Sequence, residues 1–120
     1  MKPDHLYIGI DSGTQGTKGI VYSTEQCKVL AEAYAGHDII ENSQGRREQD
    51  PAWWIEACTT VMEKLLADDM LNSGDVCAIG ISGQQHGMVP LDKNDRVIRP
   101  AKLWCDTQTS AQCDIITEAV

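Results

Sequence analysis

Three short apolar segments begin the chain, and turn-forming residues separate them. Residues 6–10 have the sequence Leu-Tyr-Ile-Gly-Ile and predict a buried strand that ends at Asp11. Residues 18–22 and 27–34 continue the strand pattern, with a turn predicted over residues 23–26. Connections this short favour an antiparallel meander whose first hairpin is tight and rich in glycine.

The next stretch changes from a polar segment to a helical pattern. Residues 36–50 are polar and lack periodicity, so they predict a long loop. Asp50 and Pro51 suit a helix start, because Asp can cap the first N–H groups and proline fits the first helical position. The apolar side chains that follow recur at helical spacing and predict one buried stripe, which consists of Trp54, Ala57, Cys58, Val61, Met62, Leu65 and Leu66.

The last third of the chain returns to strands. Residues 76–81 predict a second buried strand, followed by the glycine-flanked segment 83–87. Residues 88–91 and 96–98 are separated by four polar residues and predict a β-hairpin. A final helix is predicted after Asp106. The order of strands, helix, strand, hairpin and helix indicates an α/β domain.

Composition narrows the class of protein. The 120 residues are 42% hydrophobic and 23% charged, with a mean hydropathy of −0.30, as expected for one ordinary domain. No apolar run approaches the ~20 residues of a membrane span, and no charged-then-apolar leader precedes the first strand, so we expect a cytoplasmic protein without a membrane partner. The net charge of −8 argues against nucleic acid as a partner. It leaves a nucleotide substrate open, because Mg²⁺ and a few N–H groups can hold phosphates in an acidic protein.

The cysteines give no sign of a metal site or a disulfide framework. Their number is odd, no pair forms C-x-x-C and no histidine lies at metal-ligand spacing. We therefore expect reduced thiols at all five positions, which are Cys27, Cys58, Cys77, Cys105 and Cys113.

The segment Asp11-x-Gly13-Thr14-x-x-x-Lys18 carries the strongest chemical signal. A carboxylate at the end of a buried strand has a fixed position, and the glycines let the backbone bring N–H groups close to an anion. Because Asp11 would repel a bare phosphate, a Mg²⁺ ion between them is indicated. Phosphoryl transfer needs this combination of positioning and charge neutralisation. A plain β-hairpin with a polar turn explains the same residues equally well.

A second polar group follows the predicted strand over residues 76–81. Gln84, Gln85 and His86 lie between glycines just past the strand end, where α/β folds usually bind ligands. Their amides and imidazole can hydrogen-bond several hydroxyls of a small ligand, and His86 is also a candidate general base with Asp11. A solvated glycine-rich turn is the competing interpretation.

A tryptophan and a carboxylate near the end of the chain form a further candidate. The indole of Trp104 can stack on a sugar face, and Asp106 can accept a hydrogen bond from a hydroxyl. A core tryptophan followed by a helix-capping aspartate explains the pair as well.

Four motifs, in order along essentially the whole chain, resemble the FGGY family of carbohydrate kinases. They are Ile8-Gly-Ile-Asp-Ser-Gly-Thr14 with Lys18, Glu48-Gln-Asp-Pro51 with Trp53-Trp54, Ile79-Gly-Ile-Ser-Gly-Gln-Gln-His-Gly87, and Arg99-Pro-Ala-Lys-Leu-Trp104 with Asp106. The Gln-Gln-His and Trp-Cys-Asp-Thr elements are most similar to the xylulokinase branch. The resemblance implies a ribonuclease-H-like, actin-type fold with a mixed sheet flanked by helices, of which residues 1–120 form the N-terminal part of domain I.

The resemblance also implies substrates and roles. The family transfers the γ-phosphate of ATP to a sugar hydroxyl with Mg²⁺, and in the xylulokinase branch the sugar is D-xylulose. By motif, Asp11 would lie beside the metal and the γ-phosphate as a catalytic residue. Gly13, Thr14, Gln15 and Lys18 would bind the nucleotide phosphates. The implied sugar contacts are Gln85, His86 and Asp106.

Two departures from the family pattern limit these expectations. The family's general base is an aspartate in a segment that residues 1–120 lack, so we expect this fragment alone to be inactive. Gln108 stands where many members have arginine. Related kinases of ribulose, gluconate or glycerol, and a non-catalytic sugar-binding module, remain alternatives, and the sequence leaves homodimer formation open.

Overall fold

The computed structural model describes residues 4–69 and 71–120, which divide into two compact units. The first unit comprises residues up to 37 together with residues 52–84. The second comprises residues 38–51 together with residues 85–120.

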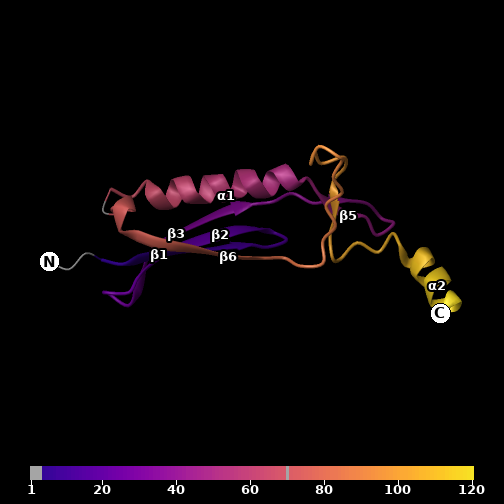
Figure 1. The fold of residues 1–120 in the computed structure, drawn as a ribbon, viewed down its shortest axis with the longest axis horizontal. Helices are drawn as coiled ribbons and strands as arrows, with labels where there is room; N and C mark the ends of the chain where they lie inside the picture. The colour runs from indigo at the N-terminus through magenta and orange to yellow at the C-terminus, as the bar shows by residue number, and fades with distance from the viewer. Residues whose placement is uncertain (1–3, 70) are drawn as a thin grey trace. The chain divides into compact units, whose positions relative to one another are not determined.

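A mixed four-stranded sheet forms the first unit (Figure 1). Its strands are β1 (Leu6–Ser12), β2 (Gly16–Ser23), β3 (Lys28–Gly36) and β6 (Val76–Gly83). The order is β3-β2-β1-β6; β2 is antiparallel to β1 and β3, whereas β6 is parallel to β1. The predicted meander is therefore confirmed.

Helix α1 (Pro51–Leu66) lies along one face of this sheet, as Figure 1 shows. Three residues of the predicted apolar stripe, Ala57, Val61 and Leu65, are buried, whereas Leu66 in the last position of the helix is 42% exposed. They pack against side chains that alternate along the strands, and the core consists of Leu6, Ile8, Ile10, Val21, Val61 and Leu65. The short 3₁₀ helix η1 (Ser73–Asp75), capped by the Asn72 side chain, leads from this helix region into β6.

Strand β6 exists as predicted, but the prediction that it is buried is wrong. Ile79 is 51% exposed and Ile81 is 71% exposed. The reason is position, since β6 is the outermost strand of the sheet and, among the strands that the structure describes, pairs only with β1. An apolar run predicts a strand without telling an edge from a centre.

The second unit contains short strands inside the segment predicted as a long loop. Strands β4 (Ile40–Glu41), β5 (Arg47–Gln49) and β7 (Ala101–Lys102) form an antiparallel sheet in the order β4-β5-β7. The loop prediction for residues 36–50 was wrong because β5 is polar: its buried residues are Glu48 and Gln49. A hydrophobic pattern cannot detect a strand whose buried side chains are hydrogen-bonded instead of apolar.

The predicted hairpin over residues 88–98 is reduced to one isolated bridge, between Leu91 and Val97. Pro90 lies inside the first predicted strand and has no N–H to donate to a ladder. Met88 pairs with Lys102 instead.

The chain ends in helix α2 (Ser110–Ala119), as predicted after Asp106. All five cysteines are free in this structure. Among the described residues, no helix has the length and apolarity that a membrane crossing requires.

Candidate active site

Asp11 lies near the end of β1 and has a polar partner on each neighbouring strand. Its register partners are Lys18 in β2 and Ser82 in β6, so the three residues form a row across the sheet. Ser82 Oγ donates a hydrogen bond to Asp11 Oδ1 at 3.2 Å. The Lys18 ammonium is 3.7 Å from the Glu32 carboxylate. A carboxylate, a hydroxyl and an ammonium group are thus presented together at one end of the sheet.

A shallow groove runs past this row. Its volume is about 480 Å³ and its lining residues are Gly9, Ile10, Asp11, Lys18, Ile20, Gly80, Ile81 and Ser82. Two of the predicted site residues, Asp11 and Lys18, are therefore on one concave surface. The groove is open beside Gly80, where an added Cβ atom would have no neighbour within 4 Å.

Hydrogen bonds close the loop after β1 and also connect it to the residue after β6. The Gly13 N–H donates to the Gly16 carbonyl at 2.9 Å. Thr14 Oγ1 donates to Gln84 Oε1 at 3.0 Å, and the Gln84 N–H donates to the Ser12 carbonyl at 3.0 Å. The loop that the sequence predicts as a phosphate loop is thus tied to the residue that follows β6.

A histidine that the sequence analysis did not select contacts this loop from the end of β3. The His37 ring lies 3.0 Å from both the Gly13 carbonyl and Thr17 Oγ1. The His37 N–H donates to the Gln15 carbonyl at 2.9 Å. Because the residue follows a strand end without a motif around it, nothing in its sequence context distinguishes it from a solvated polar residue.

The predicted sugar contacts Gln85 and His86 belong to the second unit, where both side chains are exposed. His86 has a φ of 60°, in the left-handed region that non-glycine residues rarely adopt. Met88, two residues further, is held by a pair of backbone hydrogen bonds to Lys102 at 2.9 and 3.1 Å. The exposed side chains of Gln85 and His86 therefore lie just before Met88, whose backbone is held in place by Lys102.

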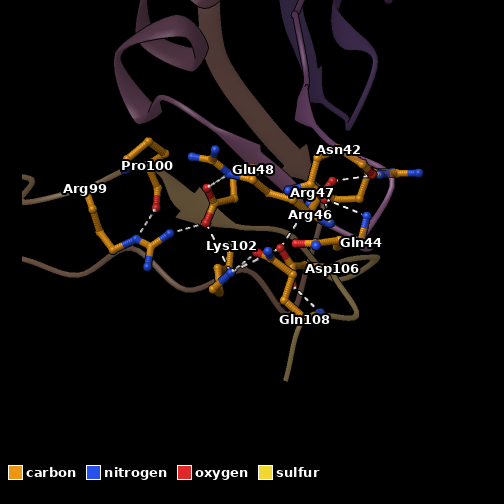
Figure 2. Close-up of polar contacts among 10 residues, drawn as sticks. All are labelled: Asn42, Gln44, Arg46, Arg47, Glu48, Arg99, Pro100, Lys102, Asp106 and Gln108. Carbon is orange, nitrogen blue, oxygen red and sulfur yellow. Dashed lines mark hydrogen bonds and ion pairs between the residues drawn. The ribbon is translucent and has the colours of Figure 1, made fainter. Parts of the chain in front are cut away.

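Asp106, the third predicted sugar contact, is engaged within the protein (Figure 2). Its Oδ2 accepts from the Arg47 N–H at 3.0 Å and from Lys102 Nζ at 3.2 Å. Its Oδ1 accepts from the Gln108 N–H at 2.9 Å. The side chain is only 3% exposed. Both carboxylate oxygens thus already serve to hold the turn that follows Trp104.

Figure 2 also shows a second buried carboxylate beside Lys102. Glu48 has a fully buried side chain and accepts from Arg46 Nε at 2.6 Å, from Lys102 Nζ at 3.1 Å and from the Arg99 guanidinium. Three cationic groups from two distant segments therefore meet one carboxylate. Such a group is tolerated in the interior because its charge is paired and hydrogen-bonded.

Burial and pairing act in opposite directions on these two carboxyl groups. Burial tends to raise the pKa of Glu48, but hydrogen bonds from Arg46 and Lys102 outweigh it and hold the pKa below its ordinary value. Burial likewise tends to raise the pKa of Asp106, which two backbone N–H groups and Lys102 hold below its ordinary value. Both groups therefore favour the ionised state in the folded protein.

Comparison with known proteins shows the family of the chain. A model of the N-terminal domain of the FGGY family of carbohydrate kinases matches residues 6–120. The chain belongs to the FGGY family of carbohydrate kinases. Over 117 residues it is 52% identical to a xylulose kinase of Haemophilus influenzae, and the match covers 94% of this chain and 24% of that protein. The chain thus spans about a quarter of the length of this curated relative.

Solved structures of family members have the same fold. A ligand-bound xylulose kinase from Lactobacillus acidophilus matches with a TM-score of 0.85 at 25% identity, covering 96% of this chain and 23% of that one. A gluconate kinase from the same organism matches with a TM-score of 0.80 at 28% identity, covering 97% and 22%. The predicted actin-type fold with a mixed sheet flanked by helices is confirmed, and it is shared by kinases named for different sugars.

Proposed function

We propose that this chain supplies the phosphate-binding surface and part of the sugar-binding surface of an ATP-dependent sugar kinase that acts on D-xylulose. The observation that carries the proposal is the row of Lys18, Asp11 and Ser82, which lies beside the closed loop 13–16. A negative group flanked by a cation and a hydroxyl, next to a loop with glycines, suits the transfer of a phosphoryl group.

In this proposal the γ-phosphate of ATP lies at the loop, and Gly13, Thr14, Gln15 and Lys18 bind the phosphates. The loop supplies N–H donors, which hold anions without a localised charge of their own. Lys18 adds a positive charge, and its partner Glu32 is exposed, so the ammonium is not committed to a buried pair. Asp11 then lies on the face where the transferred group passes.

Mg²⁺ is the cation that we propose beside Asp11. The Asp11 side chain is exposed and offers carboxylate oxygens, which hard cations prefer. Among residues 4–69 and 71–120, no cluster of three or more His, Cys, Asp or Glu residues could hold a metal unaided. The donor set fits an ion that takes its remaining ligands from phosphate and water, as Mg²⁺ usually does. When bound, the ion neutralises phosphate charge.

For the sugar we propose contacts to Gln85 and His86. An amide and an imidazole can each donate and accept, which suits a ligand with several hydroxyls. The left-handed backbone of His86 costs on the order of 1–3 kcal/mol, and such conformations concentrate at functional sites. For Asp106 the proposal is narrower, because its oxygens already accept three hydrogen bonds, so a sugar hydroxyl must use a remaining lone pair.

D-xylulose is proposed because the 52% identical relative is a xylulose kinase. The fold does not separate the alternatives, since a gluconate kinase matches it almost as well. The family resemblance puts the general base outside residues 1–120, so we propose that these residues alone do not turn over substrate.

The test is ADP release with Mg-ATP and one acceptor at a time: D-xylulose, D-ribulose, D-gluconate or glycerol, with a no-sugar control. It is run on the gene product as encoded and on residues 1–120 alone. The proposal predicts D-xylulose-dependent turnover by the gene product and none by residues 1–120. If the gene product turns over only another acceptor, that acceptor replaces D-xylulose as the proposed substrate. Turnover by residues 1–120 would require a base within them, and its absence from both samples would overturn the kinase assignment.

A further inference from the structure

His37 contacts the loop between β1 and β2 at two positions and the start of β2 at a third. Its Nδ1 lies 3.0 Å from the Gly13 carbonyl, its backbone N–H donates to the Gln15 carbonyl at 2.9 Å, and its Nε2 lies 3.0 Å from Thr17 Oγ1. These contacts cross 20 to 24 positions of the sequence. One residue outside the loop thus holds Gly13 and Gln15 in the loop and Thr17 in the strand that follows it.

The partners fix the protons on the ring. A carbonyl oxygen can only accept, so Nδ1 carries the hydrogen that is donated to the Gly13 carbonyl. In the neutral ring Nε2 is then an acceptor and takes the hydrogen of the Thr17 hydroxyl. Thr17 is fully buried, and its hydroxyl has two neighbours inside the protein, His37 Nε2 at 3.0 Å and Ser12 Oγ at 3.4 Å, of which the histidine is the nearer. A side chain with one polar atom can satisfy either Gly13 or Thr17, but not both.

Tyr34 supports the same loop independently. Its hydroxyl donates to the Gln15 carbonyl at 3.1 Å. Gly16 lies so close to the Tyr34 ring that any Cβ atom at this position would clash with it and lie 2.7 Å from the Ala35 carbonyl. The Gln15 carbonyl therefore receives two donors, and the backbone after it has little room to move.

Holding the carbonyls also orients the N–H groups. A trans peptide is planar, so its N–H points opposite to its C=O. Because the Gly13 carbonyl is directed at His37, the N–H of Thr14 is directed away from His37. The Gln15 carbonyl is likewise directed at the His37 N–H, so the N–H of Gly16 is directed away from His37. Loop N–H groups that share an orientation before a ligand arrives bind an anion without a reorganisation cost.

We propose that His37 is a positioning residue for phosphate binding: it holds the Gly13 and Gln15 carbonyls and so orients the loop N–H groups toward the nucleotide phosphates. The inference rests on the proposed function of loop 13–16 and extends it to a residue outside every motif. It concerns nucleotide binding and leaves the sugar contacts of the second unit unaffected.

The experiment compares three variants of the gene product. His37→Asn retains an amide donor near Nδ1, His37→Gln places an amide near Nε2, and His37→Leu has neither. The matched control is His5→Leu, because His5 lies in the same unit but contacts Glu25 at an exposed turn. The readouts are the KM for ATP, the KM for D-xylulose, and hydrogen exchange of the amides of residues 13–16.

For His37→Leu we expect the KM for ATP to rise about tenfold or more, since two hydrogen bonds of about 1 kcal/mol are lost. The KM for D-xylulose stays within about twofold, and loop exchange accelerates about tenfold. His37→Asn recovers part of the ATP effect, and His5→Leu changes none of the readouts. Equal rises in both KM values, or an unchanged KM for ATP, would overturn the proposal.

If the gene product has no kinase activity, the proposed function is wrong, but the hydrogen-bonding role of His37 can still be tested. In that case exchange alone decides: faster exchange at residues 13–16 in His37→Leu supports the positioning role. Exchange equal to that of His5→Leu overturns it.

Discussion

Lys102 and Glu48 are direct register partners in neighbouring strands, and Lys102 Nζ lies 3.1 Å from Glu48 Oε2. The Glu48 side chain is fully buried, whereas that of Lys102 is 20% exposed. Through its side chain Lys102 also binds Asp106, and through its backbone it pairs with Met88. One residue thereby connects the segment after His86 with the turn that contains Asp106, which are the two proposed sugar-contacting segments of the second unit.

The Glu48→Gln variant should be strongly destabilised. The substitution keeps the shape of the side chain but removes the charge that Arg46, Arg99 and Lys102 share. We expect the free energy of unfolding to fall by about 2–3 kcal/mol, at the low end for a broken buried pair because the cations retain some solvent. Urea unfolding of the gene product, followed by circular dichroism, measures it.

The matched control is Glu41→Gln, in the adjacent strand β4. Glu41 pairs with Arg47 at 3.5 Å but is 61% exposed, so its loss should cost less than about 0.5 kcal/mol. Equal effects of the two substitutions would show that burial of Glu48 adds nothing.

The lowered pKa values of Glu48 and Asp106 predict acid sensitivity. Their ordinary values are 4.5 and 3.8, and both are lower in the folded protein. As the pH falls below about 5, the unfolded chain binds protons on these groups before the folded protein does, so the free energy of unfolding decreases. Above that pH the two carboxylates make their full contribution to the free energy of unfolding.

Thermal unfolding between pH 3.5 and pH 7 provides the measurement. We expect Tm to be level near neutral pH and to drop below pH 5, with a shallower drop in Glu48→Gln because one of the two linked groups is gone. Identical slopes in the two proteins would contradict the assigned role of Glu48.

Asp106→Asn should affect sugar binding more than nucleotide binding. Oδ1 and Oδ2 both accept hydrogen bonds, so an amide loses at least one of them whichever way it turns. We expect a loss of about 1–2 kcal/mol in stability and a severalfold higher KM for D-xylulose. Steady-state kinetics with each substrate varied separate the two KM values.

Asp114→Asn serves as the control, because Asp114 is exposed on α2. A higher KM for ATP with an unchanged KM for D-xylulose in Asp106→Asn would place this turn at the nucleotide instead.

The first unit could be predicted from sequence because its signal is apolar. Strands β1 and β2 and helix α1 bury side chains at the spacing of their own secondary structure, so alternation and the helical stripe predict them. Asp11 is a candidate from sequence because it ends such a strand before a glycine-containing loop. The exposure of β6 could not be predicted, since its edge position depends on the order of the strands.

The second unit could not be predicted in this way because polar contacts hold it together. The buried Glu48 carboxylate is paired with Arg99 and Lys102, which lie about fifty positions further along the chain. No local sequence pattern predicts these ion pairs. His37 was missed for the same reason, since its partners Gly13 and Thr17 lie more than 15 positions away. Motif resemblance makes Asp106 a candidate sugar contact, but only the structure shows that its oxygens already accept hydrogen bonds within the protein.

Gly19→Ala should destabilise the first unit by overpacking. A Cβ atom at Gly19 would clash with Val61 and lie 2.9 Å from Leu65 Cδ1, both of which are buried side chains of α1. We expect a cost of about 2 kcal/mol, because a packed core yields little to added volume. Gly80→Ala is the control, since no atom lies within 4 Å of the added group, and it should be neutral or slightly stabilising. If both variants lose a similar free energy of unfolding, overpacking against α1 is not the cause of the loss at Gly19.

Asp11→Asn separates the charge of this side chain from its shape. The amide oxygen can still accept from Ser82 Oγ, so stability should change by less than about 0.5 kcal/mol. Without the negative charge the proposed cation loses its one charged protein ligand, and we expect kcat to fall by about 10²–10³-fold, the scale of one lost electrostatic contact in a transition state. Asp69→Asn, at an exposed position after α1, controls for net charge. If Asp11→Asn retains the kcat of the unmodified protein, the row of Lys18, Asp11 and Ser82 does not carry the chemistry, and the reacting phosphate must lie elsewhere.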